Sequence, residues 1–341
     1  MIQKLKSKLD GNNFLLAITI ILFAMLYIAG MIVFGDKNFA KPQVFFNLFI
    51  NNAGLIVAAV GMTMVLITGG IDISIGSVIG MTCMLLAWMM EKLEMSAGMS
   101  IVIVLIVGTV FGLVQGILVA YFKIQPFIVT LAGMFFARGM TAVISSDMIS
   151  ITNPTFLGMA NAKLYLPIMG MVNKKGNMVY PYIYPSVIIA IVILIIAFLV
   201  LKFTSFGRSI YAVGGNEQSA LLMGLNVKRT KLKVYVLNGF LAALAGFVFC
   251  LNSCGGFVEQ ARGFEMEAIA SSVIGGTLLT GGVGSVIGSL FGVLIKGTIE
   301  SLITFQGTLS SWWTKIAIAA LLCFFIILQS IFAKLKEKKS A

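Results

Sequence analysis

Ten apolar runs, most of them close to 20 residues long, follow one another along the 341-residue chain. A helix of about 20 apolar residues is long enough to cross the hydrocarbon core of a bilayer. Hydrophobic residues make up 59% of the chain and charged residues only 11%, far from the balance of a soluble domain. The chain is therefore predicted to be an all-α, polytopic membrane protein with about ten transmembrane helices, forming one domain over residues 1–341. The predicted spans are Phe14–Phe34, Phe45–Thr68, Ile71–Met90, Ile101–Tyr121, Pro126–Ile144, Tyr184–Leu201, Val234–Cys250, Glu267–Leu279, Val283–Thr304 and Trp312–Phe332.

The 24 Lys and Arg residues are distributed unevenly between these spans. With ten crossings both termini lie on one side, and that side holds most of the basic residues, including the six of segment 202–233. The positive-inside rule makes this side cytoplasmic. The net charge of +12 is thus explained by topology and anionic lipid rather than by nucleic acid. The longest outer segment, 145–181, is predicted to form a small cap over the outer face.

Two absences restrict the chemistry that the chain can perform. The sequence has no His, which removes the usual metal ligand and the usual proton relay near neutral pH. It also has no GxxxxGK[ST] motif, so any ATP would be bound by another chain. Without a nucleophile and base constellation or a metal-ligand set, a membrane-embedded enzyme is the weakest hypothesis.

A short internal sequence repeat relates ITGGIDISIGSVIG (67–80) to LTGGVGSVIG (279–288). It predicts two related halves, each with a helix broken at a TGG turn, as in many transporters. Freed backbone groups survive inside a membrane only where protein or a wet cavity covers them. The glycines of these turns are therefore candidates for a translocation pathway, the alternative being ordinary glycine-rich helix packing. They are Gly69, Gly70, Gly281 and Gly282. The spacing of Gly284, Gly288 and Gly292 favours close helix contact over a dinucleotide fingerprint.

Charged side chains inside spans are costly, so each is a candidate for function. Lys296 and Glu300 lie four residues apart, on one helix face, and are predicted to pair. Arg138 lies within another span. A polar translocation route and plain structural pairing both remain open for these three residues. The candidate pathway residues besides the glycines are Asp72, Ser74, Arg138, Glu267, Lys296 and Glu300.

Segment 202–233 contains a short helix with its own start and stop signals, within GGNEQSALLMG (214–224). Asn216 can cap the helix, Glu217 complements the dipole at its N-terminus, and Gly224 can end it in a left-handed conformation. Fewer than about 12 residues are too few for stability alone. Its apolar body between basic flanks favours docking in a protein groove over a loose loop resting on lipid. The candidate contact residues are Gly214, Gly215, Asn216, Glu217, Ala220, Leu221 and Gly224.

Four motifs in order resemble the membrane permeases of bacterial ABC importers for monosaccharides, the ribose, xylose and galactoside group. They are GGIDISIGSVIG (69–80), QPFIVTLAGMFFARG (125–139), FGRSIYAVGGNEQSALLMGLNV (206–227) and EAIASSVIGGTLLTGGVGSVIGSLFG (267–292). The segments AGMFFARG, ISITNP and GTLSSWWTKIAIA look most similar to a permease subunit of galactofuranose importers.

This resemblance implies a permease subunit of the bacterial inner membrane, not an enzyme, that imports a monosaccharide such as galactofuranose. It implies a second permease, identical or homologous, and a cytoplasmic ATPase whose two cassettes bind ATP and Mg. A periplasmic or lipid-anchored sugar-binding protein would dock outside. The family's coupling segment falls on 214–224 and its first conserved turn on Gly69, Gly70, Asp72 and Ser74. The alternative is an ion-coupled secondary transporter or channel, with Glu300 as its ionisable group.

Overall fold

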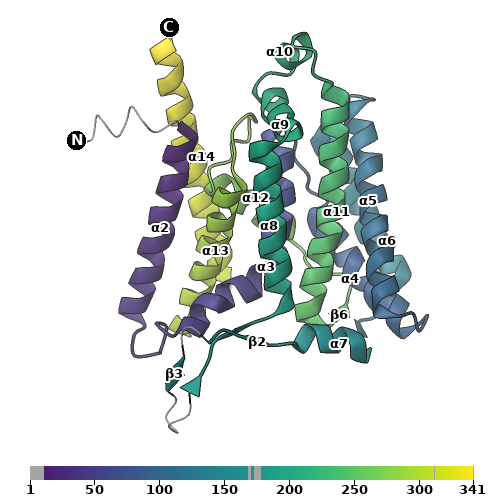
Figure 1. Cartoon of the computed structure of the whole chain (residues 1–341), viewed down its shortest axis with the longest axis vertical. Helices are drawn as coiled ribbons and strands as arrows, with labels where there is room; N and C mark the ends of the chain where they lie inside the picture. The colour runs from purple at the N-terminus through teal and green to yellow at the C-terminus, as the bar shows by residue number, and fades with distance from the viewer. Residues whose placement is uncertain (1–10, 168–169, 173–177, 311, 341) are drawn as a thin grey trace.

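The computed structural model describes residues 11–167, 170–172, 178–310 and 312–340. Long helices run side by side between two faces of the molecule (Figure 1). We call the face where α2 begins and α14 ends the terminal face, and the other the opposite face. The helices are α2 (Gly11–Val33), α3 (Pro42–Ile67), α4 (Ile75–Glu91), α5 (Ala97–Ala120), α6 (Pro126–Ile144), α7 (Pro154–Asn161), α8 (Pro185–Phe203), α9 (Ser205–Gly215), α10 (Glu217–Leu222), α11 (Val227–Ser253), α12 (Phe264–Ile274), α13 (Val286–Gln306) and α14 (Trp312–Ser340).

Seven of the described helices are long and apolar enough to cross a membrane: α2, α3, α5, α6, α8, α11 and α13. Helix α4 and the Trp312–Leu328 part of α14 are apolar but shorter. Helix α12 has only 11 residues. The prediction of a helical polytopic membrane protein is confirmed, whereas the count of ten crossings stays a prediction.

Helix boundaries follow local signals where the sequence provides them. A proline occupies the first turn of α3, α6 and α8, where its missing N–H costs nothing. The predicted span Pro126–Ile144 matches α6 residue for residue. At two other places the helix begins at a different residue from the predicted span. Residues 71–74 precede α4 instead of belonging to it, and α11 begins at Val227 because the Asn226 side chain accepts a hydrogen bond from the Arg229 N–H at 2.9 Å.

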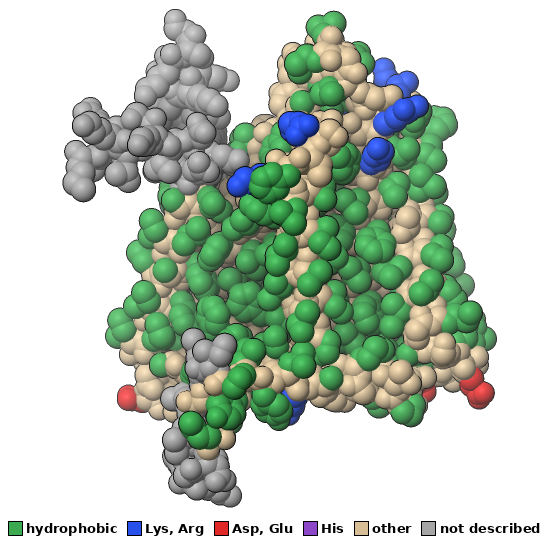
Figure 2. Space-filling view, in the orientation of Figure 1, with side chains coloured by type: hydrophobic (Ala, Val, Ile, Leu, Met, Phe, Trp, Pro, Cys, Tyr) green, Lys and Arg blue, Asp and Glu red, His purple; other side chains and the backbone are tan. Residues whose placement is uncertain are grey.

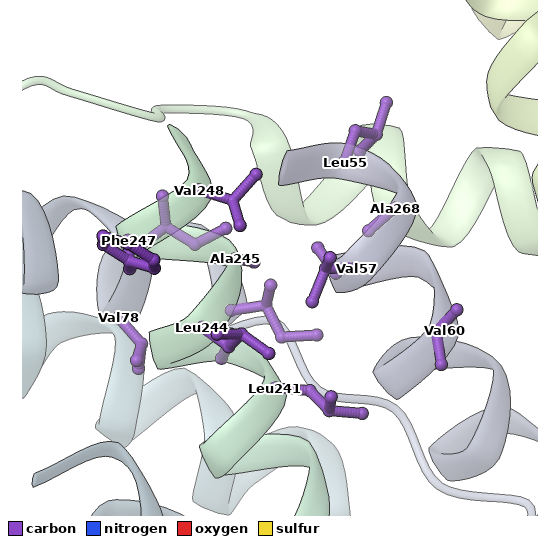
Figure 3. Packing of buried hydrophobic residues seen from close by; sticks show 14 of the residues in the cluster. Leu55, Val57, Val60, Val78, Leu241, Leu244, Ala245, Phe247, Val248 and Ala268 are labelled. Carbon is purple, nitrogen blue, oxygen red and sulfur yellow. The ribbon is translucent and has the colours of Figure 1, made fainter. Parts of the chain in front are cut away.

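The core lies along α3 and α11, which the other helices surround (Figure 1). Figure 3 shows Val57 and Val60 of α3 facing Leu241 and Leu244 of α11, with Val78 of α4 alongside. Glycines let α11 lie directly against α5. A Cβ added to Gly112 would overlap the Tyr235 carbonyl oxygen. Close contact of this kind is how helices associate in membranes.

The outer surface of the bundle is apolar between its two faces. Figure 2 shows a hydrophobic belt, with Lys and Arg side chains above it near α9 to α11 and acidic side chains at the opposite face. Ile106 of α5 and Ile195 of α8 are 57% and 50% exposed and belong to this belt. Such a surface suits lipid.

The described residues of segment 145–181 lie at the opposite face and form short elements (Figure 1). β1 (Ile149–Ser150) pairs antiparallel with β6 (Gly255–Gly256). β2 (Leu164–Tyr165) pairs with β5 (Tyr182–Ile183), and β3 (Met171–Val172) pairs with β4 (Met178–Val179). Helix α7 is held by the ring of Phe156, whose centroid lies 6.2 Å from that of Phe247 in α11. Residues 168–169 and 173–177 of the predicted cap lie outside the described part of the chain.

Candidate functional site

The two TGG turns, far apart in sequence, lie next to each other. The first ends α3, with Gly69 at φ +78°, and the second lies between α12 and α13, with Gly281 at φ +88°. The Gly282 N–H donates a hydrogen bond to the Ile67 carbonyl at 2.8 Å. An added Cβ on Gly281 would come within 2.9 Å of the Gly69 nitrogen, which only glycine avoids. The two equivalent turns of the internal repeat are thus in direct backbone contact.

A third glycine segment, the end of α9, closes on both turns. A Cβ on Gly214 would overlap the Ile67 carbonyl oxygen and lie 2.6 Å from the Gly282 nitrogen. The Tyr211 hydroxyl of α9 also donates to the Gly284 carbonyl at 2.9 Å. We call Gly69, Gly214, Gly281 and Gly282 the glycine junction. The junction connects the end of α9, which precedes α10, to both TGG turns. The sequence did not predict this contact.

Asp72 and Ser74 lie in the non-helical segment that leads from the first turn into α4, and both are buried. The Asp72 carboxylate accepts hydrogen bonds from the Ser74 N–H at 2.8 Å, the Ser74 hydroxyl at 2.6 Å and the Asn238 amide at 2.6 Å. The Gln115 amide in turn donates to the Ser74 hydroxyl at 2.9 Å. Asp72 therefore links the segment between α3 and α4 directly to α11 and, through Ser74, to α5. This network supports the structural reading of Asp72 and Ser74; their place on a pathway stays a prediction.

Replacing Asp72 by Asn is expected to destabilise the protein. An amide keeps the size of the side chain but turns an NH2 group toward the donors of Ser74 or Asn238, and an unsatisfied buried group costs about 1–3 kcal/mol. The measurement is the apparent melting temperature of purified protein in detergent. Asp147→Asn, at an exposed position of the cap, serves as control and should melt like the wild type. Equal melting of Asp72→Asn and the wild type would contradict the assignment.

Lys296, Glu300 and Glu267 form one cluster at the centre of α13 and the start of α12. The Lys296 ammonium lies 2.9 Å from the Glu300 carboxylate, so the predicted pair is confirmed, and 3.4 Å from the Glu267 carboxylate. It also donates to the Asn52 side-chain oxygen of α3 at 3.3 Å. The sequence placed Glu267 among the candidates without pairing it, and it missed Asn52.

Arg138 lies apart from this cluster and has a structural role. Its guanidinium donates to the Val258 and Gln260 carbonyls, both at 2.7 Å. These carbonyls belong to the irregular segment between β6 and α12, whose backbone needs partners inside the bundle. Of the two interpretations left open for Arg138, the structure favours the structural one.

The short helix of segment 202–233 forms as its signals predict. The Asn216 side chain accepts a hydrogen bond from the Ser219 N–H at 2.8 Å, and Gly224 has φ +80°. Glu217 forms a 2.6 Å ion pair with Lys231, which ties α10 to the start of α11. Segment 202–233 is mostly helical, because α8 continues to Phe203 and α9 spans most of the residues between α8 and α10.

One predicted contact residue of this helix points the wrong way. Ala220 is fully buried among Val213 and Val227, so it supports α10 from inside instead of meeting a partner. The apolar residues Leu221, Leu222 and Met223 are exposed instead, with 64%, 88% and 68% of their surface accessible to solvent. Leu222 and Met223 belong to the apolar body from which docking was predicted, but they were not among the candidate contact residues. We call these three residues the α10 tip.

A family model described as "Branched-chain amino acid transport system / permease component" matches residues 44–326. The chain belongs to this permease family. The permease is 41% identical to the inner membrane ABC transporter permease protein YjfF of Escherichia coli K12, over 97% of the chain and 96% of that protein. It is 36% identical to the fructose import permease protein FruG of Bifidobacterium longum, over 94% and 92%. It is 33% identical to the ribose import permease protein RbsC of Escherichia coli K12, over 91% and 92%. No solved structure matches.

These relatives confirm the resemblance to permeases of sugar ABC importers. The match covers nearly the whole permease, including both TGG turns, the charge cluster and α10. The family description names branched-chain amino acids, whereas two of these relatives are named for the import of a sugar.

Proposed function

We propose that this chain is the transmembrane subunit of an ATP-driven importer for a monosaccharide. The observation that carries the proposal is the α10 tip, an apolar surface held out at the terminal face and connected through the glycine junction to both broken helices. The sugars named for the relatives support a monosaccharide as cargo. Galactofuranose is the first candidate, because of the sequence segments AGMFFARG, ISITNP and GTLSSWWTKIAIA.

The α10 tip has the character of a docking element. Helix α10 projects beyond the hydrophobic belt (Figures 1 and 2). Basic residues lie beside it, including Lys228 and Arg229, so lipid tails do not cover it. Exposed apolar side chains on a short helix suit a hydrophobic groove of a protein partner. The partner proposed is a cytoplasmic ATPase that binds ATP and Mg, which leaves this chain without a catalytic role of its own.

The glycine junction gives the ATPase a route to the membrane. Gly214 lies at the end of α9, just before α10, and contacts Ile67 and Gly282 through backbone atoms alone. Movement of α10 on closure of the ATP-bound cassettes would therefore shift both TGG turns together. This couples one cytoplasmic event to the two broken helices, and so to the switch between outward and inward access.

The charge distribution supports a cytoplasmic terminal face in a bacterial inner membrane. Lys and Arg side chains gather at that face (Figure 2), as the positive-inside rule requires of cytoplasmic segments. Both termini are then cytoplasmic, and the cap of 145–181 faces the periplasm. There it would receive a sugar-binding protein, while a second permease, identical or homologous, completes the membrane part.

The test is uptake by proteoliposomes that contain the permease, its ATPase and its binding protein. Labelled pentoses and hexoses, galactofuranose included, are offered outside and ATP is enclosed on the cytoplasmic side. Uptake should require ATP and the ATPase and should persist with an ionophore. Uptake that continues without the ATPase and collapses with the ionophore would establish the ion-coupled alternative instead. Glu300, its candidate ionisable group, is already paired with Lys296 at 2.9 Å.

A further inference from the structure

A pocket of about 470 Å³, lined by both charged and apolar residues, opens between α12, α13 and α14. The α13 end and the α14 start that line it lie toward the opposite face (Figure 1). Its volume is within the usual range for small-molecule sites, about 300–1,000 Å³. Its polar and aromatic lining residues are Glu267, Lys296, Glu300, Thr304, Trp312, Thr314 and Lys315.

The charges of this pocket are placed where lipid cannot cover them. Lys296 is the central residue of the 21-residue helix α13, and Glu300 and Thr304 continue the same helix face toward its end. The Glu300 side chain is 50% exposed. A charged group at such a depth faces water, protein or a polar ligand, because contact with hydrocarbon is too costly. This face therefore interrupts the lipid-facing belt.

The carboxylates keep most of their hydrogen-bonding capacity free. Lys296 is deep in the wall, with 11% of its side chain exposed, and neutralises part of the negative charge of Glu267 and Glu300. Each carboxylate has about four acceptor sites, of which the ammonium occupies few. With Lys315, which also lines the pocket, the four charged side chains sum to zero. Such acceptors suit a neutral molecule with several hydroxyl donors better than an anion.

Trp312 adds an aromatic surface at the mouth of the pocket. The Lys315 ammonium lies 4.6 Å from the centroid of its ring, on one side, and the residue is 68% exposed. A flat aromatic ring is a platform for the apolar C–H face of a sugar, while the polar groups bind its hydroxyls. A metal ion suits the pocket less, since no group of three His, Cys, Asp or Glu fit to hold one occurs among the described residues.

We infer that this pocket is a monosaccharide subsite of the translocation path, with Glu300 and Glu267 accepting from sugar hydroxyls and Trp312 stacking on the ring. The inference rests on the proposed function. Under the proposed orientation the pocket opens toward the side from which cargo arrives. A branched-chain amino acid, the cargo in the family description, has neither hydroxyl donors for the carboxylates nor a ring to stack on Trp312.

The first experiment measures access to the pocket in the assembled importer. Thr304→Cys, in a chain whose Cys254 and Cys323 are replaced by Ser, is exposed to a charged thiol reagent. Ile106→Cys, on the lipid-facing side of α5, is the matched control. Thr304→Cys should react several-fold faster than the control, and D-ribose, D-fructose or galactofuranose should slow it while L-leucine does not. Protection by L-leucine alone, or by none of these probes, would overturn the sugar subsite.

The second experiment measures uptake by pocket variants. Trp312→Ala should raise the apparent KM roughly tenfold, the scale of losing an aromatic anchor. Trp312→Tyr should restore most of the affinity. Trp313→Ala, at a neighbouring Trp 50% exposed, should behave like the wild type. Glu300→Gln should also raise KM, with the ATP requirement unchanged. ATP-driven sugar uptake that is identical in all these variants would overturn the subsite and leave the proposed function standing.

Discussion

Leu222→Asp is expected to abolish ATP-dependent uptake while the permease still inserts and folds. Leu222 is 88% exposed, so its replacement removes little packing from this chain. A carboxylate in an apolar docking groove would instead be buried without a partner, which is strongly unfavourable. The measurements are ATP-driven uptake in proteoliposomes and retention of the ATPase when the permease is purified. Both should be lost together.

The matched control for this variant adds the same charge elsewhere on α10. Gln218 is exposed near the start of the helix, where an acidic residue is tolerated or favourable. Gln218→Glu should therefore keep both uptake and ATPase retention. Ala220→Arg is a poor probe, because Ala220 is buried against Val213 and Val227 and the variant would disrupt the segment itself. Full uptake by Leu222→Asp would remove the α10 tip from the coupling interface.

Gly214→Ala is expected to cause the largest structural damage of any single methyl group added near α10. The new Cβ would overlap the Ile67 carbonyl oxygen and approach the Gly282 nitrogen, both backbone atoms that cannot rotate away. Overpacking a well-packed interior costs about 1–3 kcal/mol or more. The yield of monodisperse protein and its melting temperature should both fall, and uptake should be lost.

The adjacent glycine supplies the control. A Cβ added to Gly215 meets nothing within 4 Å, so Gly215→Ala should express, melt and transport like the wild type. The two variants differ by one position and have the same helix propensity change. If Gly214→Ala were as stable and active as Gly215→Ala, the backbone contact at the glycine junction would be unnecessary for the fold and for coupling.

Local signals made much of the fold predictable from sequence. Pro126 at the start and the apolar run behind it fixed α6, and the Asn216 cap with Gly224 fixed α10. Such features act within one or two helical turns and need no tertiary information. The start of α4 was misjudged for the converse reason. Ile71 and Ile73 are apolar like the helix that follows, whereas the hydrogen bonds of Asp72 to Ser74 and to Asn238 of α11 hold these residues outside the helix.

The individual motifs of the site were predictable from the sequence, but their arrangement in space was not. The sequence identified both TGG turns, the Lys296 and Glu300 pair and the capped helix, because each is visible as a short pattern. Their assembly depends on contacts between residues more than 60 positions apart, such as Gly214 with Gly282 and Asn52 with Lys296. Neither spacing nor composition encodes such contacts in one sequence. The inward direction of Ala220 also depends on packing against α9 and α11 rather than on its own helix.

The glycine junction also limits how such a permease can change over evolutionary time or in the hands of an engineer. Where two side chains touch, enlargement of one can be offset by shortening the other. At Gly214, Gly281 and Gly282 there is no side chain left to shorten. A chimaera that receives residues 205–226 from another permease would therefore have to receive matching TGG turns as well, and the three segments are expected to be inherited as one unit.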